Sequence, residues 1–202
     1  LVHERGIEIG LKSQEAVRAM KPPTTKKELQ CLIGKINFVR RFISNLSGRI
    51  EPFMGLVKIK SDEEFRWGAE QQRAFDEIKE YLTKPPVLVP PQQDRPFYIY
   101  LSVADTSIAS VVVHRYDGME RVAFYLSRRM LDAETRYPDI EKLCLCLFFT
   151  CTKLRHILLS AEIVIICKSD VIKHMLSAPV LKGRLGKWMF ALSEFDLRYQ
   201  SA

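Results

Sequence analysis

The sequence has few of the residues that build disulfide frameworks or metal centres. Five cysteines and four histidines occur in 202 residues, without a CxxC, HExxH or HxH pattern. Neither residue type therefore has the spacing of a zinc site. The histidines are His3, His114, His156 and His174. We interpret the cysteines as reduced core thiols and expect an intracellular protein, cytoplasmic or nuclear.

Long apolar runs and glycine-rich phosphate loops are also missing. The apolar stretch from Leu143 to Phe149 is too short to cross a bilayer and is soon followed by Lys153 and Arg155. We therefore expect no membrane partner, and no phosphate loop of the nucleotide-binding kind. The chain opens on Leu1 without a charged leader or cleavage site, so we expect its N-terminus to be a cut within a longer sequence.

Positive charge and apolar residues are what the sequence does have. Thirty-one Lys and Arg oppose 24 Asp and Glu, which gives a formal charge of +7. This excess favours a polyanionic partner such as nucleic acid, although a merely soluble basic surface explains the composition equally well. With 47% apolar residues, the chain can form one large domain or two small ones with real cores.

The first half reads as helical. Thr25 and Glu28 form a capping-box signature, and apolar residues follow at helical spacing to Ile43, which predicts a helix over 25–43. A second helix is expected over 70–82. Basic side chains of the first helix emerge away from its apolar stripe, where either solvent or phosphate would meet them. These candidate nucleic-acid-binding residues are Lys26, Lys27, Lys35, Arg40 and Arg41.

The second half reads as a mixed α/β unit. Five prolines between 84 and 96 predict an extended surface connector, so we place a boundary near 90 and expect two units, 1–90 and 91–202. Beyond it the pattern predicts the order βββαβααβ. The expected strands are 97–102, 108–115, 121–126, 162–167 and 197–199, and the expected helices are 139–158, 171–176 and 184–195.

Four strings in fixed order carry a family resemblance. They are RGIEI at 5–9, PPTTKKELQCLIGKINFVRRFI at 22–43, FRWGAEQQRAFDEIKEYL at 65–82 and PPVLVPP at 85–91. The chain resembles Pol polyproteins of gypsy-type LTR retrotransposons, most like those of plants. The resemblance implies a helical thumb and connection segment over 1–90, followed by a ribonuclease-H-like domain with a mixed sheet. Because the sequence holds no Y-x-D-D string, we expect no polymerase activity from this chain alone.

The resemblance also identifies positions where the family holds magnesium through carboxylates. Matching 108–111 to the family's I-G-A-V string places Ser102 at its first Asp. Matching 141–146 to the family's E-K-E-x-L-A string places Leu143 at the Glu of the family's long helix. Aligning the short helix that follows the fourth strand places Lys168 at the family's next Asp. No catalytic residue is then intact, and no metal or other cofactor is predicted here, whereas active family members use magnesium.

Each of these positions has a carboxylate nearby, namely Asp105, Glu141 and Asp170. Three residues along a strand reverse the face, and two along a helix turn the side chain by roughly 200°. We therefore expect Asp105 to be a turn residue, Glu141 an exposed acid of the first helical turn and Asp170 a helix N-cap. The alternative is an active magnesium-dependent ribonuclease H that uses these three carboxylates.

Three hypotheses follow for the function. The first is a non-catalytic module that guides an RNA–DNA hybrid or other nucleic acid and stays attached to other parts of the Pol polyprotein, in a cytoplasmic virus-like particle or the nucleus. The second is the active ribonuclease H. The third is a scaffold without nucleic-acid contact. Trp188 and Phe190 on the late helix are aromatic residues that stack on bases in some proteins, but such residues are more often core.

Overall fold

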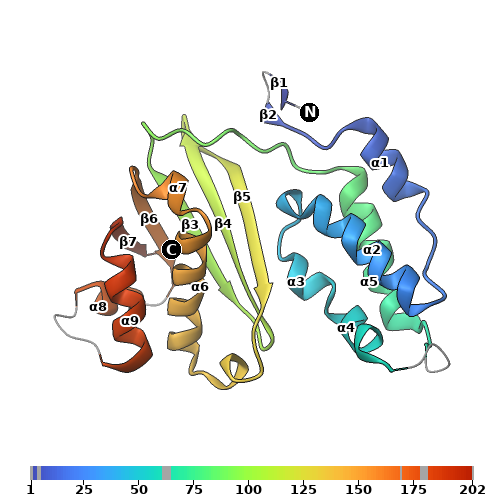
Figure 1. The fold of residues 1–202 in the computed structure, drawn as a ribbon. Helices are drawn as coiled ribbons and strands as arrows, with labels where there is room; N and C mark the ends of the chain where they lie inside the picture. The colour runs from blue at the N-terminus through green and yellow to red at the C-terminus, as the bar shows by residue number, and fades with distance from the viewer. Residues whose placement is uncertain (1, 4–5, 61–64, 169, 178–181, 202) are drawn as a thin grey trace.

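The computed structural model describes residues 2–3, 6–60, 65–168, 170–177 and 182–201. Helices fill the N-terminal half, and a sheet flanked by helices forms the C-terminal half, as Figure 1 shows. None of the helices in these ranges is long and apolar enough to cross a membrane. The mixed α/β fold with the strand and helix order expected from the sequence is confirmed.

The N-terminal half packs several short helices around one apolar core. Thr25 caps the second helix by accepting a hydrogen bond from the Glu28 N–H at 3.2 Å. The Glu28 carboxylate reaches one residue further back than a standard capping box, to the N–H of Thr24 at 2.7 Å. The helices are α1 (Leu11–Arg18), α2 (Lys26–Phe38), the 3-10 turn η1 (Arg40–Phe42), α3 (Leu46–Arg49), α4 (Glu51–Lys58) and α5 (Ala69–Thr83).

Two expectations for this half need correction. The helix expected over 25–43 ends at Phe38, because the chain tightens into η1 before Ile43. Helices α1, α3 and α4 were not expected, since none presents both a side-chain cap and a long apolar period. The strand-like segment at 5–9 is described only in part: β2 (Gly6–Ile7) pairs with β1 (Val2–His3), and residues 4–5 lie outside the described residues.

The C-terminal half is built on a five-stranded sheet in the order β5-β4-β3-β6-β7. β3 pairs antiparallel with β4, and β4 with β5, whereas β3–β6 and β6–β7 are parallel. Asp117 and Gly118 both have positive φ and close the β4–β5 hairpin. The strands are β3 (Phe97–Val103), β4 (Ser107–Tyr116), β5 (Met119–Arg129), β6 (Glu162–Cys167) and β7 (Asp196–Ser201).

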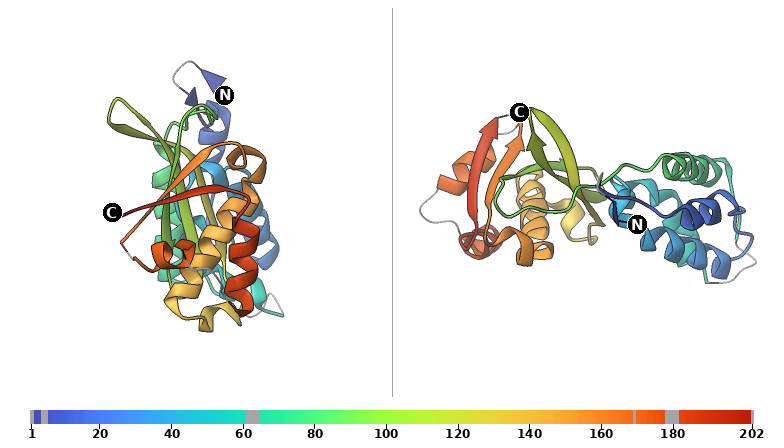
Figure 2. Two further views of the ribbon diagram at one scale, coloured as in Figure 1. Left: turned by 90° about the vertical axis from the view of Figure 1, so that its left-hand side faces the viewer. Right: turned by 90° about the horizontal axis from the view of Figure 1, so that it is seen from above.

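Helix α6 (Asp139–Lys153) crosses the sheet and contacts β3 and β4 (Figures 1 and 2). The helix expected over 139–158 is broken at Leu154, after which the short α7 (Arg155–Leu158) follows. The buried Ser110 and Thr150 hydroxyls lie 2.7 Å apart and so satisfy each other between sheet and helix. Helices α8 (Val171–Ser177) and α9 (Gly183–Leu192) complete this half, with η3 (Glu134–Arg136) before α6.

Strand β5 is where the two halves meet. η1 and α3 contact it, and the Ser47 N–H donates to the Ser127 hydroxyl at 3.0 Å. The connector was expected to run over the surface, but Leu88 and Val89 are buried and the Val89 N–H donates to the Val122 carbonyl at 2.8 Å. Burying a proline-flanked segment requires these backbone partners. The boundary near residue 90 stays a prediction.

Candidate nucleic-acid interface

The positions that the sequence assigned to lost carboxylates lie on β3, on α6 and directly after β6. The parallel register pairs Phe97 with Ile163 and Tyr100 with Ile166, and continuing it by two residues places Ser102 beside Lys168. Both side chains are exposed. Leu143 on α6 is partly buried and packs against the core between helix and sheet. A hydroxyl, an alkyl group and an ammonium group occupy these positions, none of which supplies a carboxylate ligand.

Of the three nearby carboxylates, two contact different side chains and one is exposed. Asp105 is exposed in the β3–β4 turn. Glu141 Oε2 lies 3.2 Å from Arg184 Nε, which is an ion-pair distance, but the two groups are not aligned for a hydrogen bond. The Asp170 carboxylate accepts a hydrogen bond from the Tyr199 hydroxyl at 2.9 Å. Among the described residues, no group of three or more His, Cys, Asp and Glu is placed to hold a metal ion.

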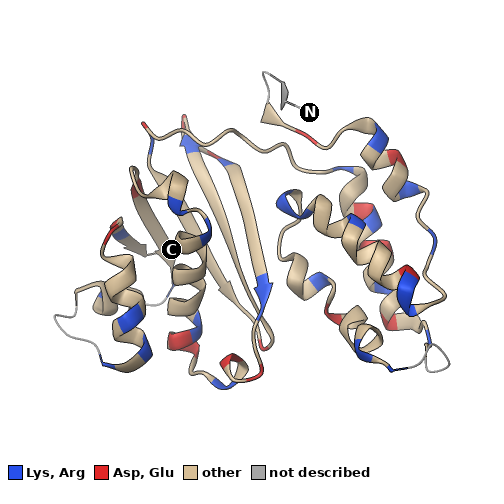
Figure 3. Cartoon of the chain, in the orientation of Figure 1, with Lys and Arg blue, Asp and Glu red and all other residues tan. Residues whose placement is uncertain are grey.

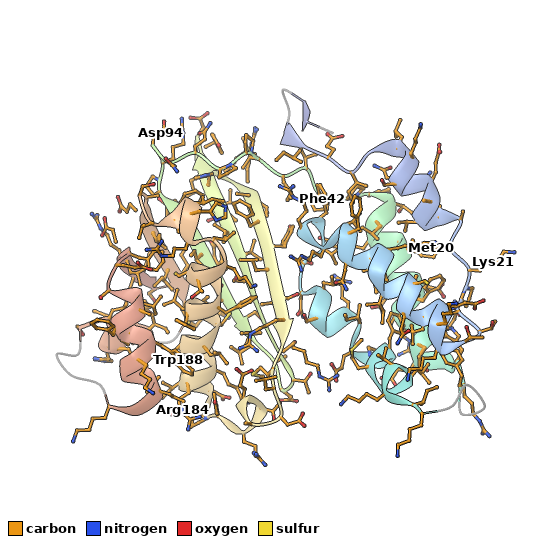
Figure 4. All side chains as sticks on the ribbon, viewed as in Figure 1. Met20, Lys21, Phe42, Asp94, Arg184 and Trp188 are labelled. Carbon is orange, nitrogen blue, oxygen red and sulfur yellow. The ribbon has the colours of Figure 1, made fainter. Side chains whose placement is uncertain are left out.

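Arg184 is held at this end of the domain by aromatic rings as well as by Glu141. Its guanidinium lies 4.0 Å from the centroid of the Tyr137 ring, and Tyr137 in turn contacts Trp188. Figure 4 shows Arg184 and Trp188 side by side on α9. Trp188 is therefore a packing residue, as expected, whereas the same expectation is wrong for Phe190, which is 83% exposed.

The five predicted basic residues do not form one patch. The Lys26 ammonium donates to the Ile59 carbonyl at 2.5 Å and so ties α2 to the end of α4. Lys27 and Lys35 line a cavity of about 640 Å³ beside α1, together with the acidic Glu28. Arg40 and Arg41 point to a different place, a groove between the halves. Figure 3 likewise shows Lys and Arg spread over both halves, mixed with acids on α5 and at the start of α6.

This interdomain groove, of about 540 Å³, combines cations with aromatic rings. Its cations are Arg40, Arg41 and Lys153, and no acid is among the described residues that line it. Its full lining is Asn37, Phe38, Arg40, Arg41, Leu46, Ser47, Ile50, Phe124, Tyr125, Leu126, Ser127, Phe149 and Lys153. A concave surface with charge of one sign focuses the field and attracts counter-ions of the other sign.

Local structure explains how the groove residues come together. Because α2 stops at Phe38 and η1 follows, Arg40 and Arg41 leave the helix beside β5, to which buried Phe42 anchors the turn (labelled in Figure 4). Lys153 comes from the last turn of α6. Burial and the neighbouring Tyr81 raise the pKa of Tyr125 to about 12, so its hydroxyl stays neutral.

The sequence did not identify Phe38 or Lys153 as candidates. For Phe38 a signal was present, since it lies off the apolar stripe of the helix and two residues before a pair of arginines, which indicates an exposed ring. Lys153 could not be found, because only the tertiary fold brings the end of α6 to η1.

His114 is the one buried histidine of the described residues, and its position is structural. The Gln92 N–H donates to Nε2 at 3.0 Å, so Nδ1 carries the proton and donates to the Pro96 carbonyl at 3.0 Å. Burial lowers the pKa of His114, which favours this neutral tautomer. Both ring nitrogens are occupied, which leaves neither for a metal ion.

Residues 67–165 match the family described as an RNase H-like domain found in reverse transcriptase. The chain is 25% identical over 188 residues to the Gag-Pol polyprotein of Walleye dermal sarcoma virus, covering 91% of the chain and 11% of that protein. It is 24% identical over 206 residues to the Pol polyprotein from transposon opus of Drosophila melanogaster, covering 97% and 20%. The chain thus spans only a small part of these relatives.

Solved structures of foamy viral protease-reverse transcriptase have the same fold. One, designated dRH and in complex with dsDNA, superposes with a TM-score of 0.81 over 100% of this chain and 36% of its own, at 20% identity. Another, in complex with an RNA/DNA hybrid, gives 0.78 over 100% and 28%, also at 20% identity. Residues 67–165 are thus similar to the RNase H-like domain found in reverse transcriptase, within a chain similar to retroviral and retrotransposon Pol polyproteins.

Proposed function

We propose that this chain is a non-catalytic module that guides nucleic acid, the connection or tether of a gypsy-type, plant-like polymerase. The observation that carries the proposal is the interdomain groove, in which Arg40, Arg41 and Lys153 meet no acid among the described lining residues. Three cations at a concave surface, with no ion-pair partner in the described part of the chain, suit a ligand with repeated negative charge. Phosphates of a nucleic-acid backbone are such a partner.

The fold relatives support the same class of ligand. The foamy viral proteins that share this fold are described in complex with dsDNA and with an RNA/DNA hybrid. In this chain the affinity would come from phosphates and not from base edges, because A-form hybrids offer side chains little access to their deep groove. Other parts of the Pol polyprotein would supply the polymerase chemistry.

The non-catalytic part of the proposal rests on the chemistry of hybrid cleavage. Two magnesium ions must be held by carboxylates that converge on one phosphate. Ser102 and Leu143 offer no such ligand, and the Lys168 ammonium would repel a metal ion placed beside it. Glu141 and Asp170 are each engaged by another side chain, so recruiting them would break an existing contact.

A salt titration of hybrid binding tests the guiding role. The chain is mixed with a labelled RNA–DNA hybrid, and the dissociation constant is measured at increasing salt concentration. We expect binding at low salt that weakens linearly on a double-logarithmic plot, with a slope of roughly 0.7–0.9 per phosphate contacted. Absence of binding at low salt would instead favour a scaffold that docks other polyprotein parts.

A cleavage assay tests the non-catalytic role. The same hybrid is incubated with the chain and magnesium, and the RNA strand is followed on a gel. We expect intact RNA. Cutting that is abolished by Asp170→Asn would contradict the proposal and assign the activity to the alternative ribonuclease H site. Cutting unaffected by that substitution points to a contaminating nuclease, which a repeat purification removes before the assay is scored.

A further inference from the structure

An aromatic ring stands exposed at the rim of the interdomain groove. Phe38 is the last residue of α2, and its side chain is 83% exposed although it lines the groove. Only Phe190, on α9, is as exposed among the described large apolar side chains. A phenylalanine in water forgoes the free energy of burial, so a ring kept at the mouth of a site suits contact with a ligand.

Further rings line the groove behind Phe38. Phe124 and Tyr125 come from β5 and Phe149 from α6, so four aromatic residues and three cations line the groove. The Arg128 guanidinium lies over the Phe149 ring at 5.5 Å from its centroid. Aromatic residues and cations together in a groove with no acid among its described lining are the combination that binds single strands, because bases stack on the rings while the cations follow the backbone.

Duplex nucleic acid uses this combination poorly. In a duplex the faces of the bases are stacked on each other and are not available to a protein ring, so only the phosphates interact. A groove of about 540 Å³ lies within the range of about 300–1,000 Å³ of sites that enclose small ligands. It therefore has room for one or two unpaired nucleotides, whereas a hybrid, which is wider, would reach only the phosphate-binding cations Arg40, Arg41 and Lys153 that are exposed along it.

We propose that the interdomain groove binds single-stranded nucleic acid, with an unpaired base stacked on Phe38 and its phosphates beside Arg40 and Arg41. This rests on the proposed guiding function and specifies which form of nucleic acid enters the groove. The strand is read without sequence preference, since every base has a face that can stack. In a working polymerase such a site would hold the unpaired strand that continues beyond the hybrid.

Two phenylalanine variants test this inference on the full chain. Phe38→Ala removes the ring at the groove, and Phe190→Ala removes an equally exposed ring on α9. Because both side chains are exposed, neither variant should unfold the protein, which circular dichroism checks. Fluorescence anisotropy then measures affinity for an oligothymidine strand of 20 nucleotides and for a blunt duplex of equal length. Phe38→Trp restores a stacking surface and serves as the conservative variant.

We expect Phe38→Ala to weaken single-strand binding by about fivefold or more, with duplex affinity within twofold of wild type. Phe190→Ala should leave both affinities unchanged, and Phe38→Trp should retain single-strand binding. Equal losses for both ligands, or no loss for either, would overturn the inference while leaving a phosphate-dependent guiding role intact. Failure of the wild-type chain to bind either ligand at low salt would overturn both.

Discussion

The interdomain groove and the first turns of α6 use charged residues in opposite ways. At the start of α6, Glu141 contacts Arg184, and the buried Lys142 ammonium lies 4.0 Å from Asp139. In the groove, Arg40 and Arg41 have no ion-pair partner among the described residues. Charges paired within the protein hold elements together, whereas charges left unpaired around a concavity are available to a ligand. The proposed binding site therefore lies away from the family's carboxylate positions.

Removal of the two groove arginines is expected to have the largest effect, and this effect is on the affinity for the RNA–DNA hybrid. Arg40→Gln with Arg41→Gln should lower hybrid affinity by roughly 10- to 100-fold at low salt, because two phosphate contacts are lost. The salt slope should fall by about 1.4–1.8. Lys182→Gln with Lys187→Gln removes the same charge from exposed positions at the start of α9 and within it, and should change affinity by no more than about twofold. Equal losses in both variants would mean that net charge, and not the groove, binds the hybrid.

Arg128 provides a further test of the comparison. It lies next to the groove, but its guanidinium forms an ion pair with Glu134. Its guanidinium donates to both carboxylate oxygens, at 2.6 and 2.9 Å. Glu134→Gln should lower the free energy of unfolding by roughly 1–2 kcal/mol at neutral pH, since a charge-assisted pair is lost. Denaturant unfolding of both proteins measures the difference.

This difference should depend on pH. The hydrogen bonds from Arg128, together with the Leu131 N–H, hold the pKa of Glu134 below its ordinary value of 4.5. Because the folded pKa is the lower one, the stabilisation is complete above the unfolded value and is lost as the pH falls through the folded value. The two proteins should therefore converge in stability in acid. A difference that persists unchanged below the folded pKa would show that Glu134 acts through packing instead.

A smaller effect is expected from breaking the pair at the start of α6. Arg184→Gln removes the contact with Glu141 and the stacking on Tyr137, and should cost roughly 1 kcal/mol of stability because Arg184 is about half exposed. Hybrid affinity should stay within about twofold of wild type. A loss of affinity comparable to that of the groove variant would place nucleic acid at the α6 end.

The smallest effect is expected for Lys153, at the edge of the groove. Lys153→Gln should weaken hybrid binding by roughly two- to fivefold, since a mobile ammonium contributes less than the fixed fork of an arginine. Lys173→Gln, at an exposed position on α8, is the matched control. Binding at low salt measures both, and an unchanged affinity for Lys153→Gln would restrict the interface to η1.

The sequence determined the regular elements better than the site. Apolar periodicity predicted α2, α5 and the succession of strands and helices along the C-terminal half. Burial of one face fixes each of these elements locally. The short α3 and η1 escaped prediction since their conformation depends on packing against β5. Of the five predicted basic residues, only Arg40 and Arg41 line the groove, and Lys153 could not be associated with them, because charge alone does not show which residues the fold brings together.

Hydrogen–deuterium exchange of the chain with and without an RNA–DNA hybrid carrying a single-stranded overhang tests the central claim most directly. Ligand binding slows exchange at the amides it covers or stabilises. We predict slower exchange in η1 and α3 and along 122–127 of β5, with no change in the first turns of α6. Slower exchange confined to the start of α6 and the end of β3 would contradict the account, because it would place the nucleic acid at the family's carboxylate positions.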